Sequence, residues 1–287
     1  MIRISSPRIV YRQSPGLKIV VTAARTFGPL RNDGPATSRC IHNDAEDTNA
    51  NSPTKRFSYT KRFGYDPKIV HQNPLGFAIR PATLNDVEAL TQLWIDSFNP
   101  SHKFWEVATP DIPATRRWLS EMWANGIKAG TSKIVTHVVE DLQKDKKLVA
   151  YSRFSPPQED GSQELPIPEW PAEWDYEVSD ALWGGMERNR LYVMGKKPHW
   201  FGEFAGVLPP YKRRGCVFPL MEWVCRQADA AGVEIYGDGT EAGLKYWKRH
   251  FGFQDRRVIK FPKRPDTYGT YEMMSIVRPP GAVVTAR

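Results

Sequence analysis

The spacing of apolar and polar positions separates a polar N-terminal part from a series of strands and helices that begins near residue 76. Short apolar runs bounded by turn residues predict strands at 77–80, 133–140, 147–154, 200–207, 233–237, 257–261 and 270–277. Apolar residues spaced three and four apart predict helices from 83 or 85 to 98 and at 114–129, 178–194, 217–231 and 244–251. This arrangement predicts a single α/β domain.

The most informative stretch is a basic turn between a predicted strand and a predicted helix. Lys212, Arg213 and Arg214 directly precede Gly215, which lets the backbone adopt conformations or approach a ligand in ways that a Cβ atom forbids. The first N–H groups of a helix are unpaired and its N-terminus is partially positive, so a phosphate binds there readily. The pattern favours an anion site over the alternative, an ordinary connection with solvated basic residues.

This stretch and the residues after it, up to Phe253, resemble the core of the GNAT superfamily of acyl-CoA N-acyltransferases, of the fungal small-molecule type. In that family a strand ends in Val-x-Pro, Tyr-[Gln/Arg]-x-x-Gly-x-[Gly/Ala] opens a helix, and a later helix closes on Gly-Phe. The matching residues are Val207, Pro209, Tyr211, Gly215, Gly252 and Phe253. Lys212 replaces the usual Gln or Arg, and Val217 replaces the second Gly or Ala. The resemblance implies a mixed, mostly antiparallel central sheet flanked by helices, at residues 76–280.

The resemblance also implies acetyl-CoA as co-substrate, no metal, and direct attack of a primary amine on the thioester. The implied coenzyme-binding residues are Val207, Lys212, Arg213, Arg214, Gly215, Cys216 and Val217. The acceptor is expected to be a small-molecule or peptide amine. The alternative is a catalytically impaired CoA-binding module of the same fold, favoured by the branched Val217 where the backbone should contact the diphosphate. A P-loop nucleotide site is excluded, because the turn lacks Gly-Lys-[Ser/Thr].

Two residues are candidates for proton transfer. Glu203 precedes the basic turn at a place where some family members carry a carboxylate base, and burial among aromatic neighbours would raise its pKa. Its alternative is an exposed residue on the polar side of the strand. Tyr246 is the implied proton donor to the leaving thiolate. The family's usual tyrosine position is held by Lys248 here, and the alternative for Tyr246 is packing under the coenzyme arm.

Other features favour the less specific interpretation. Cys216 at a helix N-terminus would have a lowered pKa, yet direct transfer needs no enzyme thiol. His199 and His102 are more readily explained as structural residues than as proton shuttles. The proline- and tryptophan-rich region at 155–175 is either a wall of the acceptor site or a packed surface insertion.

The net charge of +8 is concentrated in the N-terminal part, because residues 1–70 hold 12 basic and five acidic residues. The rest is nearly neutral, which argues against a nucleic-acid partner. No apolar run approaches the roughly 20 residues of a membrane helix. Residues 1–75 are expected to form a basic, disordered extension and linker, with 1–70 dispensable for folding. The extension suits a mitochondrial transit peptide and a cytosolic tail equally, so the protein is expected to be cytoplasmic or mitochondrial, and its oligomeric state stays open.

Overall fold

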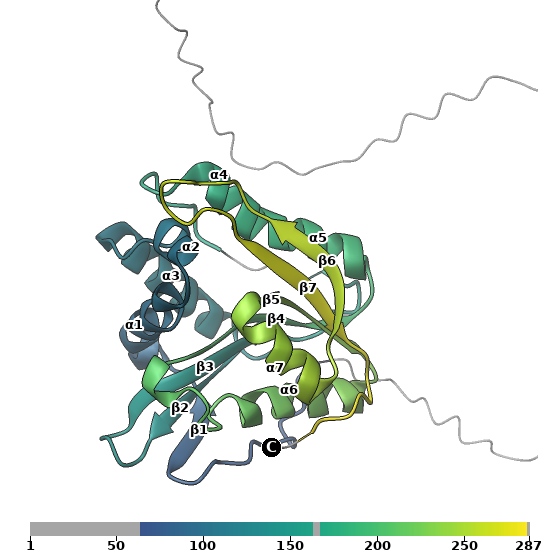
Figure 1. Ribbon diagram of the computed structural model, residues 1–287. Helices are drawn as coiled ribbons and strands as arrows, with labels where there is room; N and C mark the ends of the chain where they lie inside the picture. The colour runs from purple at the N-terminus through teal and green to yellow at the C-terminus, as the bar shows by residue number, and fades with distance from the viewer. Residues whose placement is uncertain (1–63, 163–166, 286–287) are drawn as a thin grey trace, which may run out of the picture. The chain divides into compact units, whose positions relative to one another are not determined.

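Seven strands form one mixed sheet in the described part of the chain, in the order β1-β2-β3-β4-β5-β7-β6 (Figure 1). This computed structural model describes residues 64–162 and 167–285. The strands are β1 (Phe77–Pro81), β2 (Val135–Asp141), β3 (Lys147–Ser155), β4 (His199–Val207), β5 (Glu234–Thr240), β6 (Gln254–Lys260) and β7 (Glu272–Arg278). Neighbouring strands are antiparallel, except that β4 and β5 are parallel. The expected α/β class with a mostly antiparallel sheet is confirmed.

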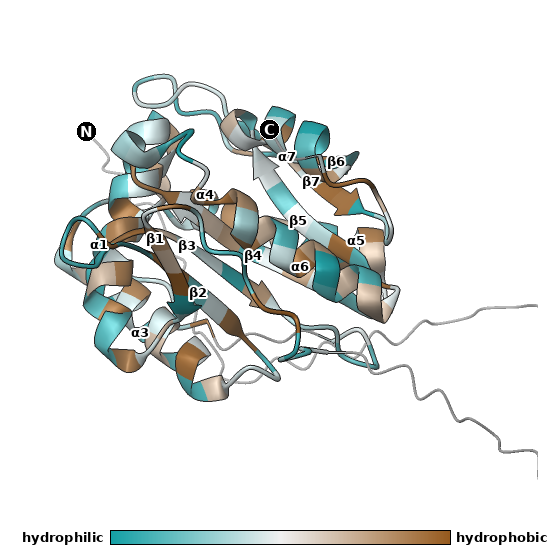
Figure 2. Cartoon of the chain, turned by 90° about the horizontal axis from the view of Figure 1, so that it is seen from below, coloured by the Kyte–Doolittle hydropathy of each residue, from teal (hydrophilic) through white to brown (hydrophobic). Residues whose placement is uncertain are grey.

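Helices cover both faces of this sheet. They are α1 (Val87–Phe98), α2 (Lys103–Ala108), α3 (Pro113–Ala129), α4 (Tyr176–Ser179), α5 (Gly185–Met194), α6 (Phe218–Ala231) and α7 (Glu241–Phe251). Alternate residues of the strands face opposite layers. Trp200 and Ile235 pack with residues of α6, whereas Phe201 and Tyr236 pack with Met194 of α5. Apolar and polar residues alternate around α1, α3 and α6, as Figure 2 shows.

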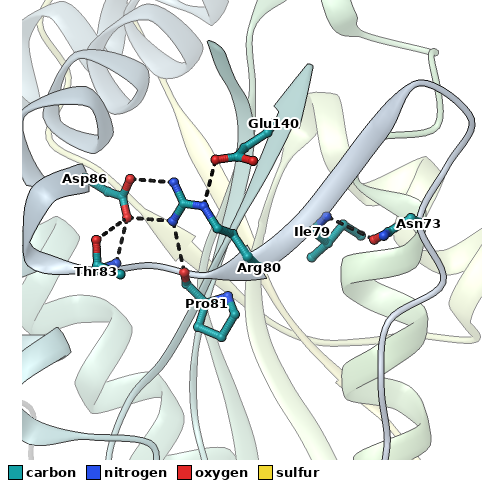
Figure 3. Close-up of polar contacts among 7 residues, drawn as sticks. All are labelled: Asn73, Ile79, Arg80, Pro81, Thr83, Asp86 and Glu140. Atoms are coloured by element: carbon teal, nitrogen blue, oxygen red, sulfur yellow. Dashed lines mark hydrogen bonds and ion pairs between the residues drawn. The ribbon is translucent and has the colours of Figure 1, made fainter. Parts of the chain in front are cut away.

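Arg80 fastens the first strand to the rest of the fold (Figure 3). Its guanidinium donates two hydrogen bonds to Asp86, at 2.8 and 2.7 Å, and one to Oε1 of Glu140 on β2, at 2.7 Å. Asp86 also accepts the backbone N–H of Thr83 at 2.7 Å, which pairs a free donor at the start of the helical turn. Arg80 therefore fixes the position at which the chain leaves β1 and enters α1.

The segment before β1 lies against α6, so contacts with the core begin before Gly76, where the pattern placed the first folded residue. The backbone of Asp66 exchanges two hydrogen bonds of 2.8 Å with the side chain of Gln227. Trp223 donates its indole N–H to the carbonyl of Ile69 at 2.8 Å. Gln227 and Trp223 are both 1% exposed, so these bonds satisfy buried polar groups. The expectations about residues 1–63 lie outside the described residues.

The structure differs from the prediction at the junction of β5 and α7. Residues 239–243 read as a turn, but β5 continues to Thr240 and α7 starts at Glu241. The strand extends because Gly239 and Thr240 pair with Met274 and Met273 of β7, which a local pattern does not reveal. The end of the preceding helix agrees with the prediction of a helix at 217–231, since α6 stops at Ala231 before a left-handed Gly232.

Candidate functional site

The two central strands separate halfway along their length. β4 and β5 pair from His199 and Glu234 up to Gly202 and Gly237. Beyond that point β4 continues along β3 and β5 continues along β7. A cavity of about 420 Å³ lies at this fork, within the usual size range of small-molecule sites. Strand edges that face each other across a fork offer backbone donors and acceptors to a ligand.

The basic loop between β4 and α6 lines part of the cavity. Six of the seven residues expected to bind the coenzyme line it: Val207, Lys212, Arg213, Gly215, Cys216 and Val217. Arg214 is the exception. Its guanidinium carbon lies 5.1 Å above the ring centre of Phe77 and 4.8 Å above that of Tyr211, on the side of β1.

The backbone of this loop takes unusual conformations. Gly215 has a φ of 84° and Arg213 a φ of 65°, and the left-handed conformation costs a residue with a Cβ about 1–2 kcal/mol. A Cβ at Gly215 would meet no atom within 4 Å, so the space beside it is open. Val217 caps α6 without a side-chain hydrogen bond, and Pro219 lies in the first turn. The helix N-terminus therefore faces the loop with unpaired N–H groups.

Cys216 differs from the sequence-based expectation. The residue is 2% exposed and belongs to the apolar core. Burial raises the pKa of its thiol, outweighing the lowering effect of Arg214. The expected lowered pKa is therefore wrong, and a thiol of this kind is a poor nucleophile.

Another part of the lining, called the aromatic chamber here, consists of Ser97, Phe98, Trp105, Leu182, Trp183 and Met186. The first three come from α1 and α2, and the last three from the helical stretch between β3 and β4. Earlier residues of that insertion pack elsewhere: buried Trp174 donates to Oγ1 of Thr115 on α3 at 2.7 Å. None of the described residues of 155–175 lines the cavity, so for them the structure favours the packed insertion over the acceptor-site wall.

Glu203 lies at the fork and lines the cavity. One step in β3, from Arg153 to Phe154, corresponds to two steps in β4, so Glu203 is the extra residue of a β-bulge. Its side chain is 3% exposed, which excludes the exposed alternative. Oε2 lies 2.9 Å from Nε of fully buried Arg153, and Oε1 accepts the hydroxyl of Ser155 at 2.7 Å. Burial raises the pKa of Glu203, while Arg153 and Ser155 oppose the shift.

A second acidic residue, Asp238, lines the same cavity from β5. Its Oδ1 accepts hydrogen bonds from Tyr236 at 2.9 Å and Ser275 at 2.7 Å. Its Oδ2 is buried and has no hydrogen-bond partner among the described residues. Burial raises the pKa of Asp238 from 3.8 to about 7, against the lowering effect of the two hydroxyls. Sequence reasoning missed this residue, because Asp238 fell between a predicted strand and a predicted turn.

Tyr246 and Trp247 of α7 both line the cavity. The ring centres of Tyr246 and His250 are 4.8 Å apart, and those of Tyr246 and Trp247 are 5.0 Å apart. Lys248, at the usual tyrosine position, is not a lining residue and instead pairs with Asp255 at 2.6 Å. The helix therefore presents Tyr246 to the cavity, as a thiolate donor requires.

The two histidines have structural roles. His199 is fully buried, Nδ1 lies 2.6 Å from the carbonyl of Lys197, and burial lowers its pKa to about 4. His102 caps α2 by accepting the backbone N–H of Phe104 at 3.1 Å. Neither lines the cavity.

Two other kinds of site are absent from the described residues. No three or more His, Cys, Asp or Glu side chains gather there in a way that would hold a metal ion. In the same residues, every helix is too short or too polar to cross a membrane.

The sequence matches no known family model and no curated protein. Several solved structures have a similar fold. One is the NAA60 protein of Arabidopsis thaliana with a bisubstrate analogue (15% identity, 72% of this chain and 99% of that chain, TM-score 0.47). Another is the ribosomal-protein-S18-alanine N-acetyltransferase of Escherichia coli (11% identity, 74% of this chain and 96% of that chain, TM-score 0.42). A third is the C-terminal condensation domain of Ebony with β-alanyl-dopamine (12% identity, 73% of this chain and 100% of that chain, TM-score 0.49). Matches of this size decide neither activity nor substrate.

Proposed function

We propose that this protein is an acetyl-CoA-dependent N-acetyltransferase acting on a primary amine. The observation that carries the proposal is the cavity at the fork of β4 and β5, because it joins three parts that the reaction needs. The basic loop with the helix N-terminus lines one part of it, and the aromatic chamber lines another. Glu203 and Asp238, two buried carboxyl groups, lie on the two strands that diverge at the fork.

The basic loop between β4 and α6 suits a diphosphate. Successive backbone N–H groups in a turn that mixes right- and left-handed residues form a concave anion site, and the N-terminus of α6 adds to it. Lys212 and Arg213 are exposed on this loop and supply full charges. The left-handed Arg213 is strained, and such strain is concentrated where a ligand has to be held.

The aromatic chamber suits an amine with an apolar body. Phe98, Trp105 and Trp183 supply aromatic surface, while the carboxyl group of Asp238 at the fork attracts the positive ammonium group. An acceptor that is apolar next to its amine satisfies both features. A strongly hydroxylated amine would leave hydroxyl groups unpaired against the rings.

Tyr246 is the proposed proton donor to the leaving thiolate, from the α7 side of the cavity. Backbone N–H groups near Val207 are the proposed donors to the thioester oxygen, as preorganised donors stabilise developing negative charge. Both roles rest on residues that line the same cavity as the basic loop.

A second candidate function is a CoA-binding module without activity. The observation that favours it is the Arg153–Glu203 pair, because a proton accepted by Glu203 would leave the guanidinium, 2.9 Å away, buried without its counter-charge. The branched Val217 beside the loop supports it further.

The test is a release assay for free CoA with acetyl-CoA and three amines: a phenylalkyl amine, a straight-chain alkyl amine and an aminosugar. We expect turnover with the first two and preference for the phenylalkyl amine. Binding of acetyl-CoA without turnover of any amine would favour the module. Preference for the aminosugar would contradict the apolar acceptor.

A further inference from the structure

Two carboxyl groups line the fork, and their surroundings differ. Accepting a proton would neutralise Glu203 and leave Arg153 buried without its counter-charge, and that guanidinium is 0% exposed. An uncompensated buried charge is strongly destabilising. Arg153 therefore opposes the rise in the pKa of Glu203 that burial causes, and Glu203 is less suited than Asp238 to take a proton.

Asp238 lies in a neutral network. Asn189 donates to Oγ of Ser275 at 3.1 Å, and Ser275 and Tyr236 donate to Oδ1 of Asp238. These bonds fix the orientation of the carboxyl group but use only one of its oxygens. Oδ2, buried and unpartnered among the described residues, is left to accept a proton.

The charged groups around Asp238 come from two neighbouring elements. On α5, Arg190 and Glu187 pair with each other at 2.6 Å, and their effects on Asp238 oppose one another. On β4, the charge of Glu203 is compensated by Arg153. No cation is paired with Asp238 in the described residues, so protonation leaves no charge uncompensated.

We propose that Asp238, and not Glu203, is the base that takes the proton from the acceptor amine, in a role that rests on the proposed acetyltransferase function. The ammonium group gives one proton to Oδ2, and the neutral nitrogen attacks the thioester carbonyl carbon. The C–N bond forms, the C–S bond breaks, and the electron pair leaves on sulfur. Tyr246 gives its phenolic proton to the thiolate and is reprotonated by the second proton lost from nitrogen, and Asp238 returns its proton to solvent.

An enzyme that uses a general base and one that does not differ in how their rates depend on pH. An alkyl amine has a pKa near 10.4, so without a base the neutral fraction, and with it the rate, rises about tenfold per pH unit below that value. With a base that titrates near neutrality, the rate rises only until the base is ionised and is then level.

The experiment measures kcat/KM against pH for the wild type, Asp238→Asn, the double variant Arg153→Met/Glu203→Gln and the exposed control Asp255→Asn, with calorimetry of acetyl-CoA binding and circular dichroism on each. We expect the wild type, the double variant and Asp255→Asn to level off near pH 7. Asp238→Asn should be about 10²–10⁴-fold slower at pH 7 and recover about tenfold per pH unit, with unchanged acetyl-CoA affinity. An active wild type and an equally fast Asp238→Asn at pH 7 overturn the inference and leave the proposed function standing. A wild type that binds acetyl-CoA and acetylates no amine overturns both.

Discussion

Removing one member of the Arg153–Glu203 pair should destabilise the protein far more than removing both. The two side chains are 0% and 3% exposed and 2.9 Å apart, so water cannot replace either partner. Loss of one partner from a buried pair costs about 3–5 kcal/mol, whereas replacing both with neutral groups of similar volume is nearly neutral. We therefore expect Arg153→Met to lower the free energy of unfolding by about 3–5 kcal/mol, and addition of Glu203→Gln to recover most of the loss.

The assay is urea unfolding at pH 7 of the wild type, both single variants and the double variant. The matched control is the exposed pair Arg116–Asp111, at 2.6 Å with side chains 40% and 44% exposed. There the coupling energy should be about 1 kcal/mol or less. Additive effects of Arg153→Met and Glu203→Gln would refute the reasoning, because they would show that neither charge depends on the other.

Three further predictions concern Asp238, the segment before β1 and Val217. The pKa of Asp238 is raised from 3.8 to about 7, so the folded state binds its proton more tightly, and stability falls as pH rises through this range. Between pH 4 and pH 8 the free energy of unfolding of the wild type should fall by about 4 kcal/mol more than that of Asp238→Asn. Free energies of unfolding that change in parallel with pH would contradict this. A chain starting at residue 73 should be about 2–4 kcal/mol less stable than one starting at 64, because Gln227 and Trp223 lose backbone partners; equal urea midpoints would show that the segment is dispensable. Val217→Gly should tighten acetyl-CoA binding in calorimetry if the branched side chain hinders the diphosphate, and unchanged affinity would show that it does not.

The sequence predicted the local units well because each has a local cause. Apolar spacing defines α6, which ends at Ala231 as predicted and is followed by Gly232 in the left-handed conformation. The basic loop was visible because its charges and Gly215 are consecutive. Six of the seven expected residues then line one cavity.

The features that the sequence could not reveal depend on contacts between distant segments. Glu203 was singled out, but its partner Arg153 is 50 positions away in the chain and meets it only across two strands. Asp238 follows Gly237 and precedes Gly239, which reads as a turn until pairing with β7 extends the strand. The alternation of Tyr236 and Asp238 was the available signal, since alternate strand residues share a face.

The central claim is that acetyl-CoA binds at the loop between β4 and α6, and calorimetry of Gly215→Val against Gly269→Val tests it most directly. The two glycines have φ values of 84° and 71°, and a Cβ at either would meet no atom within 4 Å. Both substitutions should therefore strain the backbone to a similar extent, about 1–2 kcal/mol. Gly215 lines the cavity and Gly269 does not. We predict that acetyl-CoA binds the wild type and Gly269→Val alike and fails to bind folded Gly215→Val. Equal affinity in all three proteins, or no binding to the wild type, would contradict the account.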